Sequence, residues 1–265
     1  MTPVAIITGA SAGIGTELAR VFARNGHTLV LIARRADRLA ALAREVSSPD
    51  RPPPLVLPVD LARADAVTRI AEALRGRDFA PQYVVNNAGF GLLGNAAALD
   101  RGEQLAMIDL NVRTLTELSL AFVDSLAKTK GGILNLASVA GFLPSPGMAV
   151  YYASKAYVVS FSEALHCELA PRGVRVTCLC PGPVATEFAA RAGSPGHRES
   201  SILNVSAARV AQAGYDGLMH GRRLVIPGFG NKLVPFLPRI LSRSAVLSIL
   251  ARRQRRRTAS PALRT

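Results

Sequence analysis

The stretch that decides the fold is Thr8-Gly9-Ala10-Ser11-Ala12-Gly13-Ile14-Gly15. An apolar run at residues 4–8 predicts a β-strand directly before it, and an amphipathic pattern over residues 15–25 predicts a helix directly after it. A glycine-rich turn in this position lets the backbone approach a ligand closely, and the helix N-terminus offers unpaired N–H groups and a positive dipole end. The pattern therefore predicts a turn that binds the pyrophosphate of a dinucleotide, through Gly9, Ser11, Ala12, Gly13, Ile14 and Gly15.

Outward from this turn, strand-like apolar runs alternate with helical stretches. We expect further strands at residues 28–33, 55–59, 83–86, 132–136, 175–179 and 222–227, and further helices over residues 36–46, 64–74, 105–126 and 151–169. Such alternation predicts a parallel sheet covered by helices on both faces. The expected fold class is therefore α/β, a doubly wound parallel sheet (Rossmann fold) in a single three-layer α/β/α domain, which fits the length of 265 residues.

Charge is spread unevenly along the chain. The formal net charge is +14, yet residues 217–265 contain ten arginines, one lysine and no acidic residue. We expect residues 1–230 to form the dinucleotide-binding catalytic domain and residues 231–265 a basic, apolar C-terminal extension with a helix over residues 240–251. This extension is either a solvated tail packed on the fold or a segment resting on an anionic membrane surface. An acidic partner is a weaker alternative, and we expect no binding of nucleic acid.

Other features bear on the compartment and on metals. No basic leader precedes the first predicted strand, and no apolar run reaches the roughly 18 residues that a membrane-spanning helix needs. The cysteines Cys167, Cys178 and Cys180 have neither disulfide nor zinc spacing, and the last two fall in a predicted buried strand. We therefore expect a reduced cytoplasmic protein, peripheral at the membrane at most, without a metal site.

The end of the second predicted strand indicates which nucleotide binds. An acidic residue there would accept hydrogen bonds from a ribose 2′-OH, whereas an arginine would bind a 2′-phosphate. The chain reads Ile32-Ala33-Arg34-Arg35, and Asp37 suits the first turn of the following helix. We therefore expect NADP(H), with Arg34 as the better phosphate ligand and Arg35 as the second; solvated arginines at a helix start are the alternative.

Tyr151 and Lys155 share one face of the helix predicted to begin near them. A phenol with a pKa of about 10 is a poor acid–base catalyst near neutrality, and a neighbouring ammonium favours its ionised form. Tyr152 is rotated by about 100° around the helix and does not share this lysine. Taken alone, this spacing is also typical of an exposed helix face.

Together with the glycine turn, this pair resembles the short-chain dehydrogenase/reductase family, over residues 3–228. Ser138 precedes Tyr151 by thirteen residues, and Asn111 lies in the helical stretch upstream, as in that family. The other motifs that agree in order are Asp60-Leu61, Asn86-Asn87-Ala88-Gly89 and Pro181-Gly182-Pro183-Val184 with Thr186. The resemblance implies hydride transfer between NADPH and a carbonyl or alcohol substrate, without a metal.

The resemblance also implies residue roles. Tyr151 would donate the proton, Ser138 would hold the substrate oxygen, and Asn111 would position a water that links Lys155 to solvent. Lys155 would bind the nicotinamide ribose and lower the pKa of Tyr151. The cofactor contacts implied further along the chain are Asp60 and Leu61 at the adenine, then Asn87, Ala88 and Gly89, and Pro181, Gly182, Val184 and Thr186 at the nicotinamide.

The substrate is not specified by these motifs, because one fold serves many activities. An apolar carbonyl compound is favoured, with candidate pocket walls Phe188, Ile202, Leu203, Phe229 and Leu233. The polar segment 187–204 is either a lid over the substrate or an ordinary surface loop. Reduction of 3-oxoacyl thioesters is the alternative activity, and a catalytically silent NADP-binding regulator is the alternative class. The resemblance also implies a homodimer or homotetramer.

Overall fold

Short runs of branched apolar residues form a parallel sheet at the centre of the protein. The computed structural model describes residues 1–192, 204–237 and 242–258. The strands of this part are β1 (Thr2–Thr8), β2 (Thr28–Ala33), β3 (Leu55–Pro58), β4 (Phe79–Asn86), β5 (Gly132–Leu136), β6 (Arg175–Leu179) and β7 (Leu224–Val225). They hydrogen-bond in parallel in the order β3-β2-β1-β4-β5-β6-β7. Strand β2 is buried at every position, which explains its continuous apolar sequence.

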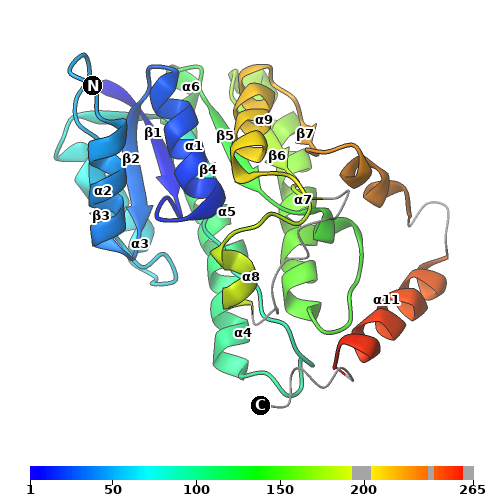
Figure 1. Cartoon of the computed structure of the whole chain (residues 1–265). Helices are drawn as coiled ribbons and strands as arrows, with labels where there is room; N and C mark the ends of the chain where they lie inside the picture. The colour runs from blue at the N-terminus through cyan, green and yellow to red at the C-terminus, as the bar shows by residue number, and fades with distance from the viewer. Residues whose placement is uncertain (193–203, 238–241, 259–265) are drawn as a thin grey trace.

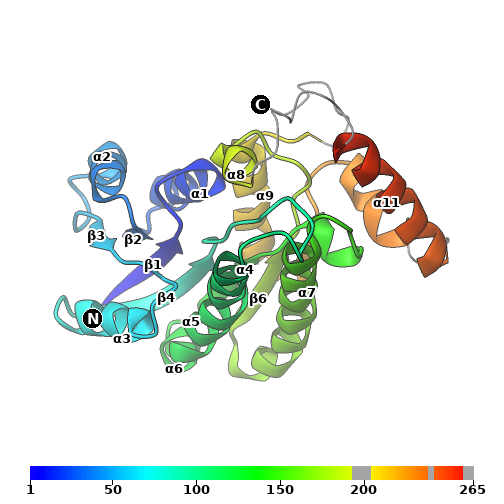
Figure 2. The same cartoon turned by 90° about the horizontal axis from the view of Figure 1, so that it is seen from below.

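Helices cover both faces of the sheet, as the alternating pattern predicts. They are α1 (Gly13–Arg24), α2 (Ala36–Val46), α3 (Ala66–Arg75), α4 (Arg101–Ile108), α5 (Leu115–Ala121), α6 (Val123–Lys128), α7 (Ala149–Leu169), α8 (Glu187–Arg191), α9 (Ala207–Met219) and α11 (Arg243–Thr258). Figure 2 shows α1, α2 and α9 on one face and α3, α5, α6 and α7 on the other. The expected three-layer, doubly wound α/β fold is therefore confirmed.

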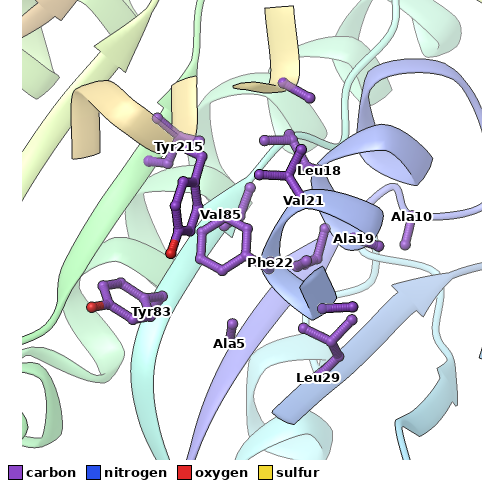
Figure 3. Close-up of a cluster of buried hydrophobic side chains, with 14 of the residues drawn as sticks. Ala5, Ala10, Leu18, Ala19, Val21, Phe22, Leu29, Tyr83, Val85 and Tyr215 are labelled. Carbon is purple, nitrogen blue, oxygen red and sulfur yellow. The ribbon is translucent and has the colours of Figure 1, made fainter. Parts of the chain in front are cut away.

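The core on the α1 side of the sheet is built around an aromatic residue. Phe22 of α1 is fully buried, and its ring meets the ring of Tyr215 of α9 edge-on at 4.9 Å between centroids. Tyr83 of β4 approaches the same ring at 5.7 Å (Figure 3). Edge-to-face pairs at this spacing add to the free energy gained by burial. This cluster fixes α1, and with it the glycine turn, above the central strands.

The stretch predicted as one helix over residues 105–126 differs in the structure. The helix begins earlier, at Arg101, because the Asp100 side chain accepts a hydrogen bond from the N–H of Glu103 at 2.7 Å and caps it. A turn of π-helix over Asp109–Thr114 then separates α4 from α5. Such π-turns break the regular hydrogen-bond ladder and are frequent at functional sites.

The sequence analysis predicted no helix at α9, which contains Gly214 and Gly217. In the structure Gly217 is buried, and a Cβ atom placed on it would lie 2.3 Å from Cγ2 of Val225 in β7. The two glycines therefore let α9 approach the sheet closely instead of ending the helix. Strand β7 is also shorter than the predicted 222–227, and Pro227 lacks the N–H needed to extend it.

The C-terminal region reaches away from the sheet. A 3₁₀ segment, Gly230–Phe236, precedes α11, whose bounds replace the helix predicted over residues 240–251. Both views show α11 at the edge of the molecule (Figures 1 and 2). Asn231 at the start of this region is completely buried. Within the described ranges, none of the helices combines the length and the hydropathy needed to cross a bilayer.

We predict that Gly217→Val destabilises the protein by about 1–3 kcal/mol, because the added methyl groups overpack the contact with β7. The expected loss opposes the higher helix propensity of valine over glycine. Denaturant unfolding followed by circular dichroism measures it. The control is Ala208→Val on the exposed side of the same helix, which should change stability by about 0.5 kcal/mol or less. Equal stability of the two variants would contradict the packing argument.

Candidate functional site

A cleft of about 770 Å³ follows the carboxyl ends of the strands. This is the edge at which doubly wound sheets bind their ligands. Most of the residues predicted for the site line it: Gly9, Ser11, Ala12, Gly13, Ile14, Arg34, Arg35, Asp60, Leu61, Asn87, Ala88, Gly89, Ser138, Tyr151, Lys155, Pro181, Gly182, Val184 and Thr186. Gly15 and Asn111 lie behind the wall of the cleft.

Gly15 serves the packing of the turn. A Cβ atom on Gly15 would lie 2.2 Å from the carbonyl oxygen of Gly9, so the helix can begin directly beneath the turn only without a side chain there. The turn is also tied to the loop after β4. Thr8 Oγ1 accepts hydrogen bonds from the N–H groups of Asn87 and Ala88 at 2.9 and 3.0 Å. The two loops that line this part of the cleft are thus held together.

Lys155 lies on α7 with only 5% of its surface exposed. Its Nζ donates a hydrogen bond to the carbonyl oxygen of Leu136, the last residue of β5, at 2.7 Å. Burial disfavours the ammonium form and lowers the pKa of Lys155 to about 8. Near neutral pH the cleft therefore contains a buried ammonium group whose pKa is only slightly above the pH of the solution.

Tyr151 lies one turn before Lys155 on α7, with its ring buried. Burial raises the pKa of the phenol above its ordinary value, and a hydrogen bond with the Ser138 side chain acts in the opposite direction. Lys155 Nζ lies 5.9 Å from the ring centroid. The pKa of Tyr151 is therefore raised overall, whereas the resemblance implies that Lys155 lowers it. Burial outweighs the other influences, and the ammonium of Lys155 points toward Leu136.

Asn111 is buried within the π-turn between α4 and α5. Its Oδ1 accepts a hydrogen bond from the N–H of Phe90 at 3.1 Å, and its Nδ2 donates to the carbonyl of Phe90 at 2.9 Å. Nδ2 also lies 3.1 Å from Oγ of Ser154, whose hydroxyl donates to the carbonyl of Tyr151. Asn111 thus joins the loop after β4 to the helix that carries Tyr151 and Lys155.

The two arginines after β2 take different positions. Arg34 is exposed on the rim of the cleft. Arg35 turns toward the glycine turn, where its Nη2 donates to the carbonyl oxygen of Ser11 at 3.2 Å and lies 3.3 Å from Ser11 Oγ. Its Nη1 also pairs with Glu187 at 2.8 Å. Arg35 therefore stands where the second strand and the glycine turn meet.

The other end of the cleft is mainly apolar. Phe188 lines it, as predicted, with its ring 5.4 Å from that of Tyr151, and Phe90, Leu92 and Met148 share this wall. The predictions for Phe229 and Leu233 are wrong, because these side chains are 83% and 57% exposed and are absent from the cleft lining. Both follow the short strand β7 and face outward. The remaining predicted wall residues, Ile202 and Leu203, and most of the predicted lid fall outside the described residues.

Sequence reasoning missed three charged residues at the cleft mouth: Arg38, Glu187 and Arg191. Arg38 pairs with Glu187, and the guanidinium of Arg191 lies over the ring of Phe90 at 4.3 Å. The sequence contained no local signal for these contacts, because α8 is far from α2 and β4 along the chain. Among the described residues, no cluster of three or more histidine, cysteine or acidic side chains is arranged to hold a metal.

This arrangement can support proton transfer next to a bound nucleotide. A buried phenol, a serine hydroxyl and a lysine meet at one end of the cleft, and glycine-turn N–H groups with an arginine stand at the other. The phenol can donate a proton, and the serine can hold an oxygen atom beside it. Fold and cleft together are those of a doubly wound, dinucleotide-binding enzyme.

Comparisons with known proteins give the family. A family model described as short chain dehydrogenase matches residues 3–195. Sulfoacetaldehyde reductase 2 of Chromohalobacter salexigens is 40% identical over 193 residues, which cover 71% of this chain and 75% of that protein. The chain belongs to the short-chain dehydrogenase family and is an oxidoreductase of this type, as the resemblance of its motifs implies.

Solved structures agree with this assignment. A short-chain dehydrogenase from Sphingobium yanoikuyae in complex with NADPH gives a TM-score of 0.78 at 29% identity, covering 100% of this chain and 98% of that one. A 3-ketoacyl-(acyl-carrier-protein) reductase from Brucella melitensis complexed with NADH gives a TM-score of 0.76 at 26% identity, covering 86% and 98%. Proteins similar to this chain thus bind nicotinamide cofactors of both kinds.

We predict that Lys155→Met stabilises the fold near neutral pH, because it removes a buried charge. The pKa of Lys155 is depressed on folding, so the cost is fully present below about pH 8 and disappears as pH rises toward the unfolded value. The shift sets an upper limit of about 3 kcal/mol on the gain, reduced by the lost hydrogen bond to Leu136.

Thermal unfolding at about pH 7 and about pH 10 checks this linkage. The advantage of Lys155→Met should shrink at the higher pH. Lys128→Met on α6 is the control, because its side chain is exposed and the substitution removes no buried charge. A pH-independent effect of Lys155→Met would contradict the proposed charge burial.

Proposed function

We propose that this chain is an NADP(H)-dependent oxidoreductase that transfers hydride between NADPH and a carbonyl or alcohol substrate. The observation that carries the proposal is that Tyr151, Ser138 and Lys155 share one cleft with the glycine turn and Arg35. The catalytic roles assigned to these residues follow from their chemistry and from the family resemblance.

The residues of the cleft fit an NADP nucleotide. The glycine turn presents the start of α1 to a pyrophosphate. Asp60 and Leu61 line the same cleft, and the family resemblance implies that they would hold the adenine. Arg35, held beside Ser11, provides a guanidinium where the 2′-phosphate of the adenosine ribose would lie, and Arg34 on the rim provides a second. The absence of an acid at the tip of β2 also favours NADP over NAD.

Bound NADPH would supply the hydride, and side chains of the protein would supply the proton. Tyr151 donates its hydroxyl proton to the carbonyl oxygen of the substrate, while Ser138 donates a hydrogen bond that holds this oxygen. Lys155 binds the hydroxyl groups of the nicotinamide ribose, and Asn111 fixes the helix that carries Tyr151 and Lys155.

With its pKa raised by burial, the phenol of Tyr151 carries the proton that reduction requires near neutrality, but it is a weaker acid than a free phenol. In the oxidative direction the same phenol must lose its proton to act as a base. The ammonium of Lys155 would then stabilise the phenolate once a bound ribose draws Nζ away from Leu136. The pKa of Lys155, about 8, places the loss of this ammonium at mildly alkaline pH.

An apolar carbonyl compound fits the substrate end best. Phe90, Leu92, Met148 and Phe188 offer aromatic and aliphatic surface beside Tyr151. One observation favours a second class, a small anionic aldehyde: Arg191 stands over Phe90 at the same wall, and the relative from Chromohalobacter is named for sulfoacetaldehyde. A substrate panel should therefore contain hydrophobic ketones, a 3-oxoacyl thioester and a sulfonated aldehyde, each followed by NADPH consumption.

We predict that Tyr151→Phe lowers turnover by about 10²- to 10⁴-fold, because the variant lacks the proton donor. Binding of NADPH should persist, since the ring and the cleft remain. Stopped reactions and NADPH fluorescence titration measure the two properties separately. Tyr152→Phe is the matched control, as its hydroxyl lies off the face shared with Lys155 and its loss should have a much smaller effect. Full activity of Tyr151→Phe would refute the proposed mechanism.

We also propose that the protein is a homodimer or homotetramer built on α4, α5 and α7. Their surface exposes Leu105, Ile108, Leu120 and Tyr157, which are between 39% and 55% exposed. Tyr157 of α7 and Thr116 of α5 hydrogen-bond through their hydroxyl groups at 2.9 Å, so the two helices form one continuous surface. Exposed apolar residues gathered in this way mark interaction surfaces.

We predict that Leu120→Arg reduces the mass of the assembly, because the interface would have to bury an unpaired charge. Size-exclusion chromatography with light scattering measures the mass. Leu247→Arg on α11, an equivalent change outside this surface, should leave the mass unchanged. An unaltered mass for Leu120→Arg would exclude this surface as the interface.

A further inference from the structure

Glu187, the first residue of α8, bridges Arg35, which caps the start of α2, and Arg38 in the first turn of that helix. Its Oε2 accepts a hydrogen bond from Nη1 of Arg35 at 2.8 Å, and its Oε1 accepts one from Nη1 of Arg38. These partners are separated from Glu187 by about 150 positions in the sequence. The contact therefore joins α8 to the start of α2 across the mouth of the cleft.

The same Arg35 contacts the glycine turn through Ser11. One guanidinium thus touches both the turn that faces the pyrophosphate and the acidic residue of α8. Ser11, Arg35 and Glu187 all line the cleft. A phosphate bound to Arg35 from within the cleft would have to share the guanidinium with the carboxylate of Glu187.

Positive charge gathers at this mouth. Burial, and after it the charges of Arg34 and Arg35, lower the pKa of Arg191 on α8, whereas acidic neighbours act in the opposite direction. Glu187 stands among these cations and neutralises part of their charge. A phosphate monoester, with up to two negative charges and three acceptor oxygens, would replace it with a stronger anion.

We propose that Glu187 competes with the 2′-phosphate of NADP for Arg35 and Arg38, and so shifts the preference of this chain from NADP(H) toward NAD(H). The inference rests on the proposed function, because it requires an NADP nucleotide in the cleft. Glu187 acts as an internal substitute for the phosphate and weakens NADP binding. NAD, with a free 2′-hydroxyl, does not have to displace it.

The exposure of the three side chains sets the size of the effect. Arg35, Arg38 and Glu187 are 39%, 46% and 55% exposed, so water and salt screen their attraction. Such pairs change a binding constant by about two- to fivefold. Glu187 therefore tunes the preference and does not block the phosphate.

Displacement of Glu187 also concerns the substrate end of the cleft. The next residue on α8, Phe188, packs its ring 5.4 Å from that of Tyr151. Arg191, at the end of the same helix, lies over Phe90. A phosphate that binds Arg35 and Arg38 thus breaks the ion pairs of Glu187. These ion pairs hold the start of α8, the helix that carries Phe188.

The test is a titration of the full chain with NADPH and NADH, followed by nicotinamide fluorescence, which is favoured here because the chain lacks tryptophan. Glu187→Gln keeps the size of the side chain and removes its charge. We expect the Kd for NADPH to fall about two- to fivefold at low salt, with the Kd for NADH unchanged. The gain should diminish at high salt.

Glu45→Gln is the matched control. Glu45 pairs through both oxygens with Arg20, at 2.7 and 3.0 Å, and is 50% exposed, but its partner is not in the cleft. Neither Kd should change in this variant. An unchanged NADPH Kd in Glu187→Gln, or equal shifts for both nucleotides, would overturn the competition. Failure of the unmodified chain to bind either nucleotide would instead overturn the proposed function, and the competition with it.

Discussion

The hydrogen bond from Nζ of Lys155 to the carbonyl oxygen of Leu136 joins the acid–base residues to the sheet. Lys155 lies on the long helix α7, and Leu136 ends a central strand, so the contact fixes where α7 begins relative to the carboxyl edge of the sheet. Tyr151 is then placed by helix geometry alone, one turn earlier on the same face. The contact also leaves an amine in a buried setting, where its charge is stabilised by little besides that carbonyl and any ligand that enters.

Asn111 and Ser154 extend this arrangement to the loop after β4. Because Asn111 bonds both polar groups of the Phe90 backbone, the loop that faces the ligand is fixed from behind by an element that does not line the cleft. The amide belongs to the π-turn between α4 and α5, and turns of this kind are frequent at functional sites. The same few polar contacts thus hold the loop after β4 and the helix that carries Tyr151 and Lys155 together.

Much of this could be predicted from the sequence, and the reasons for success and failure are physical. The bounds of β2, α2, β5 and β6 agree with the apolar patterns, since each is set by local periodicity. Helix α9 was not predicted; glycine weakens a helix locally, but Gly217 here allows close packing on β7, a contact between distant segments. The start of α4 was missed although the pair Asp100 and Glu103 signals a capped N-terminus.

Almost all the residues predicted for the site line one cleft, because the carboxyl ends of parallel strands meet at one edge of the sheet. Charge pairing could not be predicted in this way. The expectation that Arg34 is the better phosphate ligand rested on local position, whereas contacts with distant segments turn Arg35 to Ser11 and Glu187 and leave Arg34 on the rim. Likewise, the spacing of Tyr151 and Lys155 indicated a lowered phenol pKa, whereas burial, a property of the whole fold, raises it.

Asn231 gives the C-terminal region an unexpected connection. It is completely buried, donates a hydrogen bond to the carbonyl of Pro227 at 2.8 Å, and packs against Gly182 in the loop after β6. The 3₁₀ segment that it begins also touches the turn Val139–Phe142, directly after Ser138. For protein engineering, this means that a truncation or a fused tag is best placed beyond Phe236, because a cut before Asn231 would remove a buried residue that packs against the loops beside Ser138.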